Sequence, residues 1–348
     1  MDRETRDMLL ETADRFFTER SGRAIVNEVE KGVWPADLWK EIEEMGLPLI
    51  AVPEDKGGAG GTLADMLALL RTAGSHAVPV PLAETALANL LIAAAGGEPR
   101  LGPATLVLGG NLSLNGGRLS GKLERVPFAP VADRFVSVVG NTLAVIAAGN
   151  ATIDDRPSHA GEPYGTVTFD NAAAEFSAAS AVSADRAFEL AAVMRAMQMA
   201  GAADKVLATA TEYCKQRSQF GRPISTFQAI QHMLAELASY VAATIASAEA
   251  AARDADEGGL ADGGRFSIAA AKCQASDFAQ RIAAISHQAM GAMGFTHEHI
   301  LHHYTRRLWV WRRDFGSETY WGDKIGAAYA KAGPDVLWSS LTASKYAA

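Results

Sequence analysis

The chain has 348 residues, of which 49% are hydrophobic and 21% are charged, and its formal net charge is −8. This composition is ordinary for a folded globular protein and excludes a mainly disordered chain, and the negative charge argues against a nucleic-acid partner. Two cysteines make no disulfide framework, the N-terminus shows no signal or transit segment, and the longest apolar run is too short to span a bilayer, so we expect a cytoplasmic protein without a membrane span.

The first part of the chain predicts amphipathic helices. Apolar residues recur among charges at helical spacing, and the string VPEDKGGAGG marks a loop because its glycines adopt backbone conformations that other residues resist. Helices are expected over residues 2–20, 35–45, 63–74 and 82–95. Together they predict an N-terminal helical domain over residues 1–100.

The pattern then changes twice. Short β-branched runs such as RFVSVVG and TLAVIAAG alternate with Gly, Pro, Asn and Asp, which predicts a small β domain over residues 101–180. Beyond it, Ile230, Met233, Leu234 and Leu237 lie at the spacing of one helix face. A C-terminal bundle of four or five helices is expected over 181–348, with later helices at 265–290, about 297–315 and from 318 onward. The expected fold class is therefore mainly α with a small β domain.

One string is far more specific than these patterns. CKQRSQFGRPISTFQAIQHMLAEL, from Cys214 to Leu237, joins a basic, glycine-broken turn to an amphipathic helix. It resembles the signature of the acyl-CoA dehydrogenase flavoproteins. HQAMGAMGFTHEH, from His287 to His299, resembles that family's Q-x-x-G-G-x-G-(F/Y) turn, although Ala292 stands where the second glycine is usual, and VPEDKGGAGG resembles its P-E-x-x-G-G-x-G loop. With the order of helices, β domain and bundle, the resemblance covers nearly the whole chain and implies the acyl-CoA dehydrogenase fold.

The resemblance implies FAD as cofactor, held mainly by a neighbouring subunit. Arg217 would bond the pyrophosphate, because a planar guanidinium matches phosphate oxygens, and Phe220 would pack on the cofactor. Gln228 resembles a glutamine near the cofactor, and Gln288 and Gly291 match residues that contact its adenine end. Without the surrounding string, Arg217 would equally suit a carboxylate partner at a helix end, and the glycine would be an ordinary helix cap.

The usual catalytic base is not found. Dehydrogenation of an acyl-CoA thioester needs a carboxylate that removes the α-proton while the flavin accepts a hydride. By resemblance, the usual glutamate position falls on Phe315, and the position that some members use instead falls on Ala191. Asp314 is a weak candidate, since one step along a helix turns a side chain by about 100°. Glu189 is expected to face solvent or form a salt bridge, and Glu298 to lie in the first turn of a helix.

The β domain also lacks the T-E-P-x-x-G-S-D and W-I-(T/S)-N runs that line the flavin ring in this family. A chain with the Arg217 element but without ring contacts or either base resembles the short subunits of α2β2 acyl-CoA dehydrogenases. We therefore predict an FAD-dependent oxidoreductase subunit that acts on an acyl-CoA with a fuller partner subunit and an electron acceptor. Sterol or bile-acid side chains, branched groups and aromatic groups all stay open as substrates. The alternatives are a self-sufficient homo-oligomer that uses Asp314 or another displaced carboxylate, and a non-catalytic structural subunit.

Three histidines near the C-terminal end need a separate interpretation. His299 and His303 are four residues apart, with His302 between them, and such a pair can bind a metal. No suitably spaced cysteine or carboxylate completes a site in the sequence. We expect exposed helix histidines and no metal.

Overall fold

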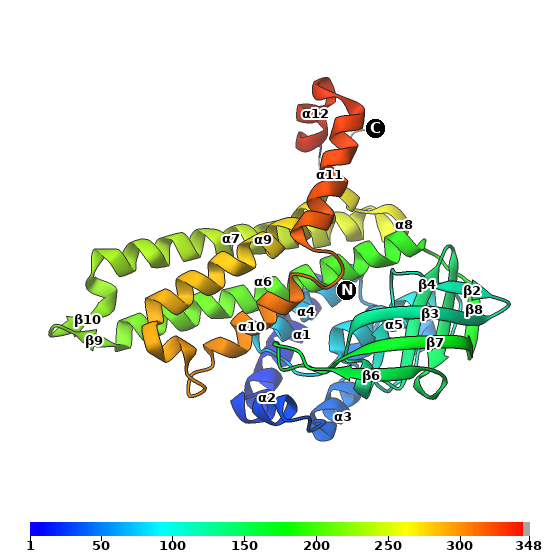
Figure 1. Cartoon of the computed structure of the whole chain (residues 1–348), viewed down its shortest axis with the longest axis horizontal. Helices are drawn as coiled ribbons and strands as arrows, with labels where there is room; N and C mark the ends of the chain where they lie inside the picture. The colour runs from blue at the N-terminus through cyan, green and yellow to red at the C-terminus, as the bar shows by residue number, and fades with distance from the viewer. Residues whose placement is uncertain (344–348) are drawn as a thin grey trace.

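The computed structural model describes residues 1–343, so the last five residues of the predicted bundle, 344–348, lie outside it. N-terminal helices and a β region lie against one half of a long helical bundle, and the other half of the bundle extends away from them (Figure 1). The predicted fold class, mainly α with a small β domain, is confirmed.

The N-terminal part is helical. Its helices are α1 (Arg3–Arg20), α2 (Arg23–Glu30), α3 (Ala36–Glu44), α4 (Leu63–Ser75) and α5 (Leu82–Ala94). α2 is a helix that the sequence did not predict. Thr62 and Asp65 form a reciprocal capping box that fixes the start of α4. α5 is apolar on nearly every side and almost wholly buried, which brings its few polar side chains into the interior.

The β region consists of two four-stranded sheets. One has the order β1 (Ala104–Leu106), β4 (Arg134–Val139), β5 (Thr142–Ala147), β8 (Phe176–Ala179), and the other has the order β2 (Ser113–Asn115), β3 (Arg118–Pro127), β7 (Tyr164–Ala173), β6 (Thr152–Arg156). Among the strands that the structure describes in these sheets, β1 and β4 pair in parallel and the others pair antiparallel. Phe135 of β4 and Phe169 of β7 meet edge to face, with ring centroids 5.6 Å apart. The two sheets therefore share one apolar core.

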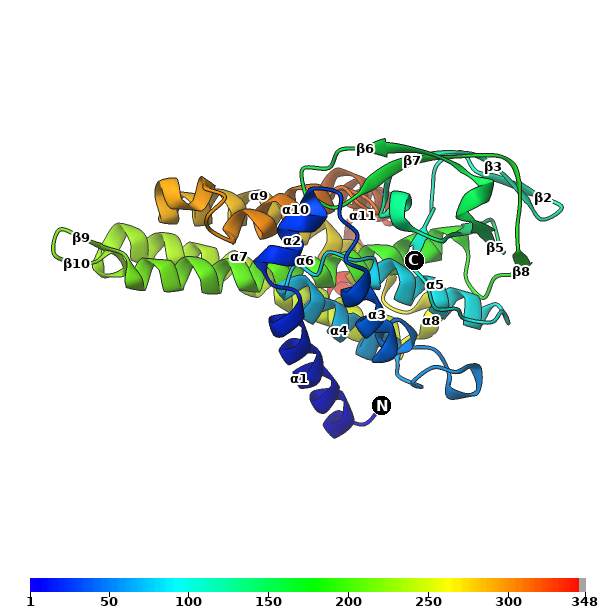
Figure 2. The same ribbon diagram turned by 90° about the horizontal axis from the view of Figure 1, so that it is seen from below.

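The C-terminal part begins with a long central helix. Its elements are α6 (Ala184–Gln216), the β9 (Ser218–Gln219) and β10 (Arg222–Pro223) hairpin, α7 (Gln228–Glu257), α8 (Gly259–Asp262), α9 (Arg265–Met290), α10 (Leu301–Trp311), α11 (Glu318–Ala332) and α12 (Leu337–Thr342). α6 packs against α4, α7, α9 and α10. Turned by 90°, the molecule shows the β9–β10 hairpin at the end of the bundle farthest from the sheets (Figure 2). No helix in the part of the chain that the structure describes is long and apolar enough to cross a membrane.

α10 is shorter at both ends than the predicted 297–315. Arg23 donates to the carbonyl oxygens of His297 (2.6 Å) and Glu298 (2.8 Å), which removes acceptors that a longer helix would need. The prediction that Glu298 lies in a helix first turn is therefore wrong, and it lies in a turn before the helix. At the other end, Phe315 and Gly316 both have positive φ, 53° and 95°, which stops the helix.

Candidate functional site

Three of the predicted cofactor residues lie around the hairpin at the far end of the bundle. Arg217 ends α6 and Gln228 begins α7. Between them the chain turns through Phe220 and Gly221, whose φ angles are 53° and 81°. Phe220 is 91% exposed, an unusual state for a phenylalanine. The ring of Phe227, which precedes Gln228, lies 6.1 Å from the Phe220 ring.

The other two predicted cofactor residues end α9. Gln288 is exposed in its last turn, and Gly291 follows with φ 59° and ψ −143°, a conformation that favours glycine. The ends of α6 and α9 are in contact, since Cys214 Sγ lies 3.8 Å from the Ala289 carbonyl oxygen. We call the five residues Arg217, Phe220, Gln228, Gln288 and Gly291 the bundle tip.

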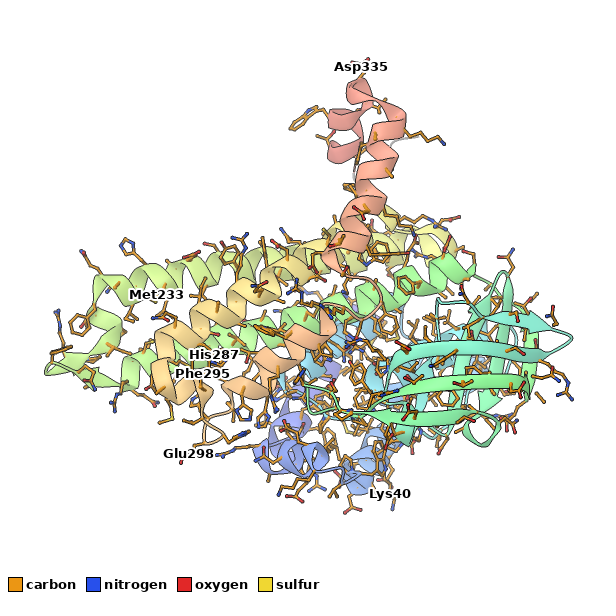
Figure 3. All side chains as sticks on the ribbon, viewed as in Figure 1. Lys40, Met233, His287, Phe295, Glu298 and Asp335 are labelled. Carbon is orange, nitrogen blue, oxygen red and sulfur yellow. The ribbon has the colours of Figure 1, made fainter. Side chains whose placement is uncertain are left out.

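An open groove of about 480 Å³ adjoins Gln288. We call it the α9 groove, and His287, Phe295 and Trp309 contribute to its walls. His287 and Phe295, labelled in Figure 3, are stacked with ring centroids 4.4 Å apart. Burial lowers the pKa of His287, so its ring is neutral near pH 7. Phe295 and Trp309 are 72% and 57% exposed, which makes the groove apolar and open to a partner.

Four ionisable side chains meet in the interior, where the N-terminal helices, the sheets and the bundle converge. Arg195 Nη2 of α6 lies 2.6 Å from Glu84 Oε1 of α5 and 3.4 Å from Asp314 Oδ2, which follows α10. Tyr164 of β7 donates its hydroxyl to the same Asp314 oxygen at 2.6 Å. All four are buried, and we call Glu84, Tyr164, Arg195 and Asp314 the central charge cluster.

Burial raises the pKa of Glu84, whereas the carboxylates of the cluster keep Arg195 charged. Burial alone would lower the pKa of Arg195, but Glu84 and Asp314 outweigh it and raise that pKa, so the guanidinium stays charged. The guanidinium also lies over the Trp311 ring at 5.2 Å and the Phe315 ring at 5.6 Å, within the range of cation–π attraction. Burial raises the pKa of the Tyr164 hydroxyl far above its usual value, which keeps it a hydrogen-bond donor.

Lys272 fixes the segment that carries Asp314. Its ammonium donates to Ser276 Oγ (2.9 Å) and to the carbonyl oxygens of Arg312 (3.0 Å) and Gly316 (2.7 Å). All three of its protons therefore have acceptors, although burial lowers the pKa of Lys272 to about 7. This clamp holds residues 312–316 in one conformation against α9.

Comparison with known proteins agrees with this geometry. Residues 3–99 match the acyl-CoA dehydrogenase N-terminal domain, and residues 181–326 match the acyl-CoA dehydrogenase C-terminal domain. IpdE2 of Mycobacterium tuberculosis is 31% identical over 311 residues, which cover 87% of this chain and 91% of IpdE2. The chain belongs to the acyl-CoA dehydrogenase family.

The chain is also similar to other acyl-CoA dehydrogenases and to solved structures. FadE34 of Mycobacterium tuberculosis is 34% identical over 306 residues, which cover 82% of this chain but 42% of FadE34, so the chain spans less than half of that relative. Among solved structures, a chain of the ChsE4-ChsE5 complex from Mycobacterium tuberculosis aligns with TM-score 0.86 at 21% identity, over 96% of this chain and 99% of that chain. A Tcur3481-Tcur3483 steroid ACAD variant aligns with TM-score 0.83 at 24% identity, over 94% and 98%. These two likenesses show the same fold.

Acyl-CoA dehydrogenases bind FAD, and the bundle tip has the chemistry to receive part of it. The Arg217 guanidinium forms no hydrogen bond or ion pair with any residue that the structure describes, and a free planar cation suits a pyrophosphate. Its main chain is ordered, because its N–H donates to Tyr213 O and its carbonyl oxygen accepts from Ile224 N. The residues present therefore fit the phosphate portion of the cofactor, approached from outside the chain.

The two residues at which the resemblance places the family's base, Phe315 and Ala191, have no ionisable group. Phe315 packs edge to face on Phe188, with centroids 6.2 Å apart, and Ala191 is fully buried in α6. Asp314 is 6% exposed and belongs to the central charge cluster. Of the two alternatives expected for Glu189, the structure has the salt bridge. Glu189 is 3% exposed and pairs with Arg186 and Arg265.

The prediction of exposed helix histidines is wrong for all three, because His299 is half-buried in a bend before α10 and the other two are buried in it. His302 and His303 are 7% and 2% exposed, because α10 packs against α6 and α9 and Glu30 of α2 lies against its start. Glu30 of α2 lies against them, with Oε1 2.9 Å from His303 Nδ1. The carboxylate that the sequence did not supply nearby comes from a residue more than 270 positions away.

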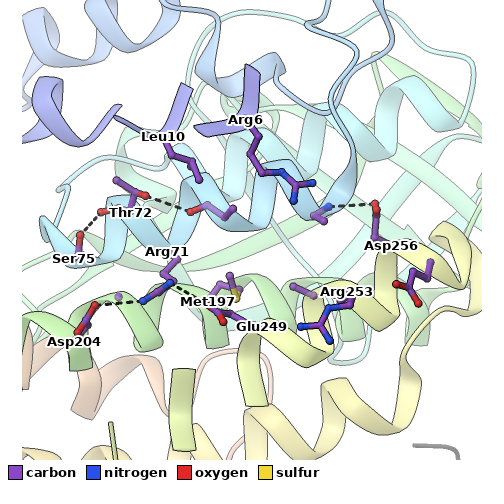
Figure 4. A pocket seen from close by; sticks show the side chains of 15 residues that line it. Arg6, Leu10, Arg71, Thr72, Ser75, Met197, Asp204, Glu249, Arg253 and Asp256 are labelled. Atoms are coloured by element: carbon purple, nitrogen blue, oxygen red, sulfur yellow. Dashed lines mark hydrogen bonds and ion pairs between the residues drawn. The ribbon is translucent and has the colours of Figure 1, made fainter. Parts of the chain in front are cut away.

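A second cavity, of about 650 Å³, lies between α1, α4, α6 and α7 (Figure 4). Its charges largely neutralise one another, because Arg71 reaches both Asp204 (3.3 Å) and Glu249 (2.6 Å) across the opening. Exposed pairs of this kind contribute little to stability. None of the predicted site residues lines this cavity.

Sequence reasoning missed Glu84, Arg195 and Tyr164. A pattern in the sequence could have indicated the first two. The apolar helix PLAETALANLL contains one acidic residue, Glu84, and the apolar helix LAAVMRAMQMA contains one basic residue, Arg195. Charged residues are almost never fully buried unless paired, so two such helices predict a buried ion pair if they pack together. Tyr164 had no comparable pattern, since its role depends on where β7 meets α10.

Proposed function

We propose that this chain is the subunit of a two-chain acyl-CoA dehydrogenase that completes the FAD site of a fuller partner, and that the partner supplies the base and the contacts to the flavin ring. The observation that carries the proposal is the central charge cluster. Asp314 is the carboxylate next to the position at which the resemblance places the family's base. In the cluster it is already paired with Arg195 and accepts a hydrogen bond from Tyr164.

A base must present an oxygen lone pair to the substrate. Asp314 Oδ2 already accepts from Tyr164, and its other oxygen lies 3.9 Å from Arg125 Nη2. Breaking a buried ion pair is costly, and a rotation of Asp314 toward a substrate would leave Arg195 with Glu84 alone and would break the hydrogen bond from Tyr164. The cluster therefore supports a structural role for Asp314.

Unlike the buried central charge cluster, the bundle tip is exposed. In the proposed complex, Arg217 neutralises phosphate charge, Phe220 covers one side of the cofactor, and Gln288 with Gly291 meets its adenine end. FAD supplies the hydride acceptor when it is bound. Along α6, Arg195 and Arg217 are 22 residues apart, or about 33 Å at 1.5 Å per residue. The tip and the cluster are therefore separate sites of this chain.

Two fold relatives support a second subunit, since the names ChsE4-ChsE5 and Tcur3481-Tcur3483 each join two chains. The second also names a steroid enzyme. We propose an acyl-CoA with a bulky, steroid-like acyl group as substrate, in the cytoplasm, with an electron acceptor that reoxidises the flavin.

The test is the Asp314→Asn variant in the assembled, flavin-loaded complex, assayed for acyl-CoA-dependent reduction of an electron acceptor per flavin. The proposal predicts turnover within about twofold of the unaltered complex. If Asp314 is the base, turnover falls about 10²–10⁴-fold, which would establish the self-sufficient alternative. Tyr164→Phe is the matched variant, because it removes the hydrogen bond to Asp314 and leaves the carboxylate in place. Circular dichroism of both variants separates loss of turnover from loss of fold.

A further inference from the structure

Glu30, His302 and His303 form a compact cluster where α2 meets the start of α10. One potential ligand atom from each of the three lies within 4.8 Å of the other two. Glu30 is half-buried and both histidines are buried. The cluster lies on the opposite end of α10 from Asp314 and shares no residue with the central charge cluster or the bundle tip.

Hydrogen bonds fix the tautomer of both rings. His302 Nδ1 lies 2.6 Å from the His299 carbonyl oxygen, which can only accept, so this nitrogen carries the proton. His303 Nδ1 lies 2.9 Å from Glu30 Oε1 and is a donor for the same reason. Each Nε2 is then an acceptor with a free lone pair. His302 has the arrangement of a metal-binding histidine, with one nitrogen tied to a carbonyl oxygen and the other free, whereas the carboxylate on His303 Nδ1 is itself a potential ligand.

Both free nitrogens are buried without a partner. His302 Nε2 and His303 Nε2 contact no donor among the residues that the structure describes. Buried polar atoms without partners are rare and each demands an explanation. His303 also lines a small cavity of about 160 Å³ between α2, the end of α4 and α10, so there is space beside the cluster.

We propose that Glu30, His302 and His303 bind one divalent transition-metal ion of the zinc class. Two imidazole nitrogens and one carboxylate, with a water molecule as fourth ligand, are a donor set that Zn²⁺ accepts. Zinc bonds to these atoms are about 2.0–2.2 Å long, so the Glu30 carboxylate must leave His303 Nδ1 before one ion can be bound by it and by both imidazoles. The metal would join the N-terminal helices to the bundle through α2 and α10.

Arg306 is the competitor for the carboxylate. Its guanidinium pairs with Glu30 Oε1, while Glu30 Oε2 accepts no hydrogen bond from the described residues. The Arg306 side chain is 31% exposed, so it can swing into solvent when a metal ion takes over the charge of Glu30. Arg307, which also belongs to α10, is held elsewhere by Glu162 at 3.0 Å.

The experiment uses the full chain after removal of metals by a chelator. Zn²⁺ is titrated by calorimetry, and Co²⁺ is titrated in parallel by visible absorption, because Co²⁺ bound to nitrogen and oxygen ligands has d–d bands. We expect one ion per chain. His302→Asn and Glu30→Gln should each weaken binding by at least about tenfold, whereas His232→Asn, an exposed histidine of α7, should leave it unchanged.

The Arg306→Gln variant should change Zn²⁺ binding in the opposite direction from the ligand variants. Removing the competing cation should tighten Zn²⁺ binding, which a merely structural change would not do. No stoichiometric ion and no Co²⁺ bands in the unaltered chain would overturn the proposal even if a variant fails to fold. Binding that survives both His302→Asn and Glu30→Gln would also overturn it, because the ion would then lie elsewhere. None of these readouts depends on flavin.

Discussion

At the residue scale, two arginines of one helix have opposite environments. Arg195 is fully buried between two carboxylates, while Arg217, at the end of the same helix, is exposed and unpaired among the described residues. A buried ion pair is expensive to break, whereas an exposed guanidinium is available to a ligand. We infer that Arg195 serves the fold and Arg217 serves the cofactor.

Arg217→Ala should therefore reduce flavin binding without disturbing the fold. Hydrogen bonds to charged groups contribute about 1.5–3 kcal/mol, so we expect about tenfold to a hundredfold weaker FAD binding in the assembled complex. The measurement is flavin per complex after gel filtration, with the solution mass recorded for the same sample.

Lys215→Ala is the matched control, since Lys215 is an exposed cation in the last turn of the same helix. Unchanged flavin in Arg217→Ala with assembly intact would favour the purely structural subunit. Equal losses in both variants would show that general positive charge, and not Arg217, attracts the cofactor.

The sequence predicted these residues unevenly. The string around Arg217 and Phe220 identified the family, because it is specific and a turn of this kind is determined by neighbouring residues, while their role in the cofactor site stays a prediction. The partners of Arg195 were not recognisable, because Glu84 is 111 positions away and meets it only through tertiary packing. Glu30 escaped prediction for the same reason, at a separation of 273 positions from His303.

At the element scale, the crossing of α4 and α6 depends on two glycines. A Cβ atom added to Gly201 would lie 1.9 Å from the Arg71 carbonyl oxygen, and one added to Gly74 would lie 2.2 Å from the Gln198 carbonyl oxygen. Neither backbone can yield without separating the helices. The close approach therefore holds the N-terminal domain against the bundle.

Gly201→Ala should destabilise the protein by about 1–3 kcal/mol, because overpacking a tight contact forces backbone shifts. Gly326→Ala, in α11, is the control, since an added Cβ there meets nothing within 4 Å. It should be neutral or more stable by up to about 1 kcal/mol, the difference between Gly and Ala in a helix. Urea unfolding measures both, and equal effects would contradict this account of the crossing.

The contact between the end of α9 and α10 should depend on pH. His287 Nε2 lies 2.9 Å from Thr305 Oγ1, and burial lowers the pKa of His287 below its ordinary 6.5. The unfolded chain then binds a proton more readily than the folded chain below pH 6.5, so the free energy of unfolding should fall as pH decreases from that value. The buried histidines of α10 contribute in the same direction.

His287→Gln isolates the contribution of His287, because glutamine stays neutral and can still bond the Thr305 hydroxyl. Its unfolding free energy should depend less steeply on pH between 6.5 and lower values than that of the unaltered protein. His232→Gln, at an exposed position, should keep the original slope. Identical slopes in all three proteins would exclude His287 as a titrating group of this contact.

Helix periodicity predicted α9 to its bounds, Arg265–Met290, because glycines flank a long regular pattern. It missed α2, whose eight residues are too few for a clear period. It also overextended α10, since the carbonyl groups that Arg23 removes from helix pairing are a tertiary effect. Short elements and helix ends therefore depend on contacts that periodicity does not contain.

At the scale of the whole molecule, the predicted cofactor residues lie at one end, and buried charge pairs lie in the interior. The bundle tip lies at the end of the bundle farthest from the sheets (Figure 1). The α9 groove beside it exposes Phe295 and Trp309, and aromatic residues are enriched in protein interfaces. This distribution suits a chain that gives part of a site to a neighbour.

The most direct measurement is flavin per chain, from visible absorbance and released FAD, on protein produced alone and on protein produced with a partner acyl-CoA dehydrogenase subunit, with solution mass recorded for both. The account predicts colourless or sub-stoichiometric protein alone, and stoichiometric flavin only in the two-chain assembly. One flavin per chain in a homo-oligomer, bleached by an acyl-CoA, would contradict it.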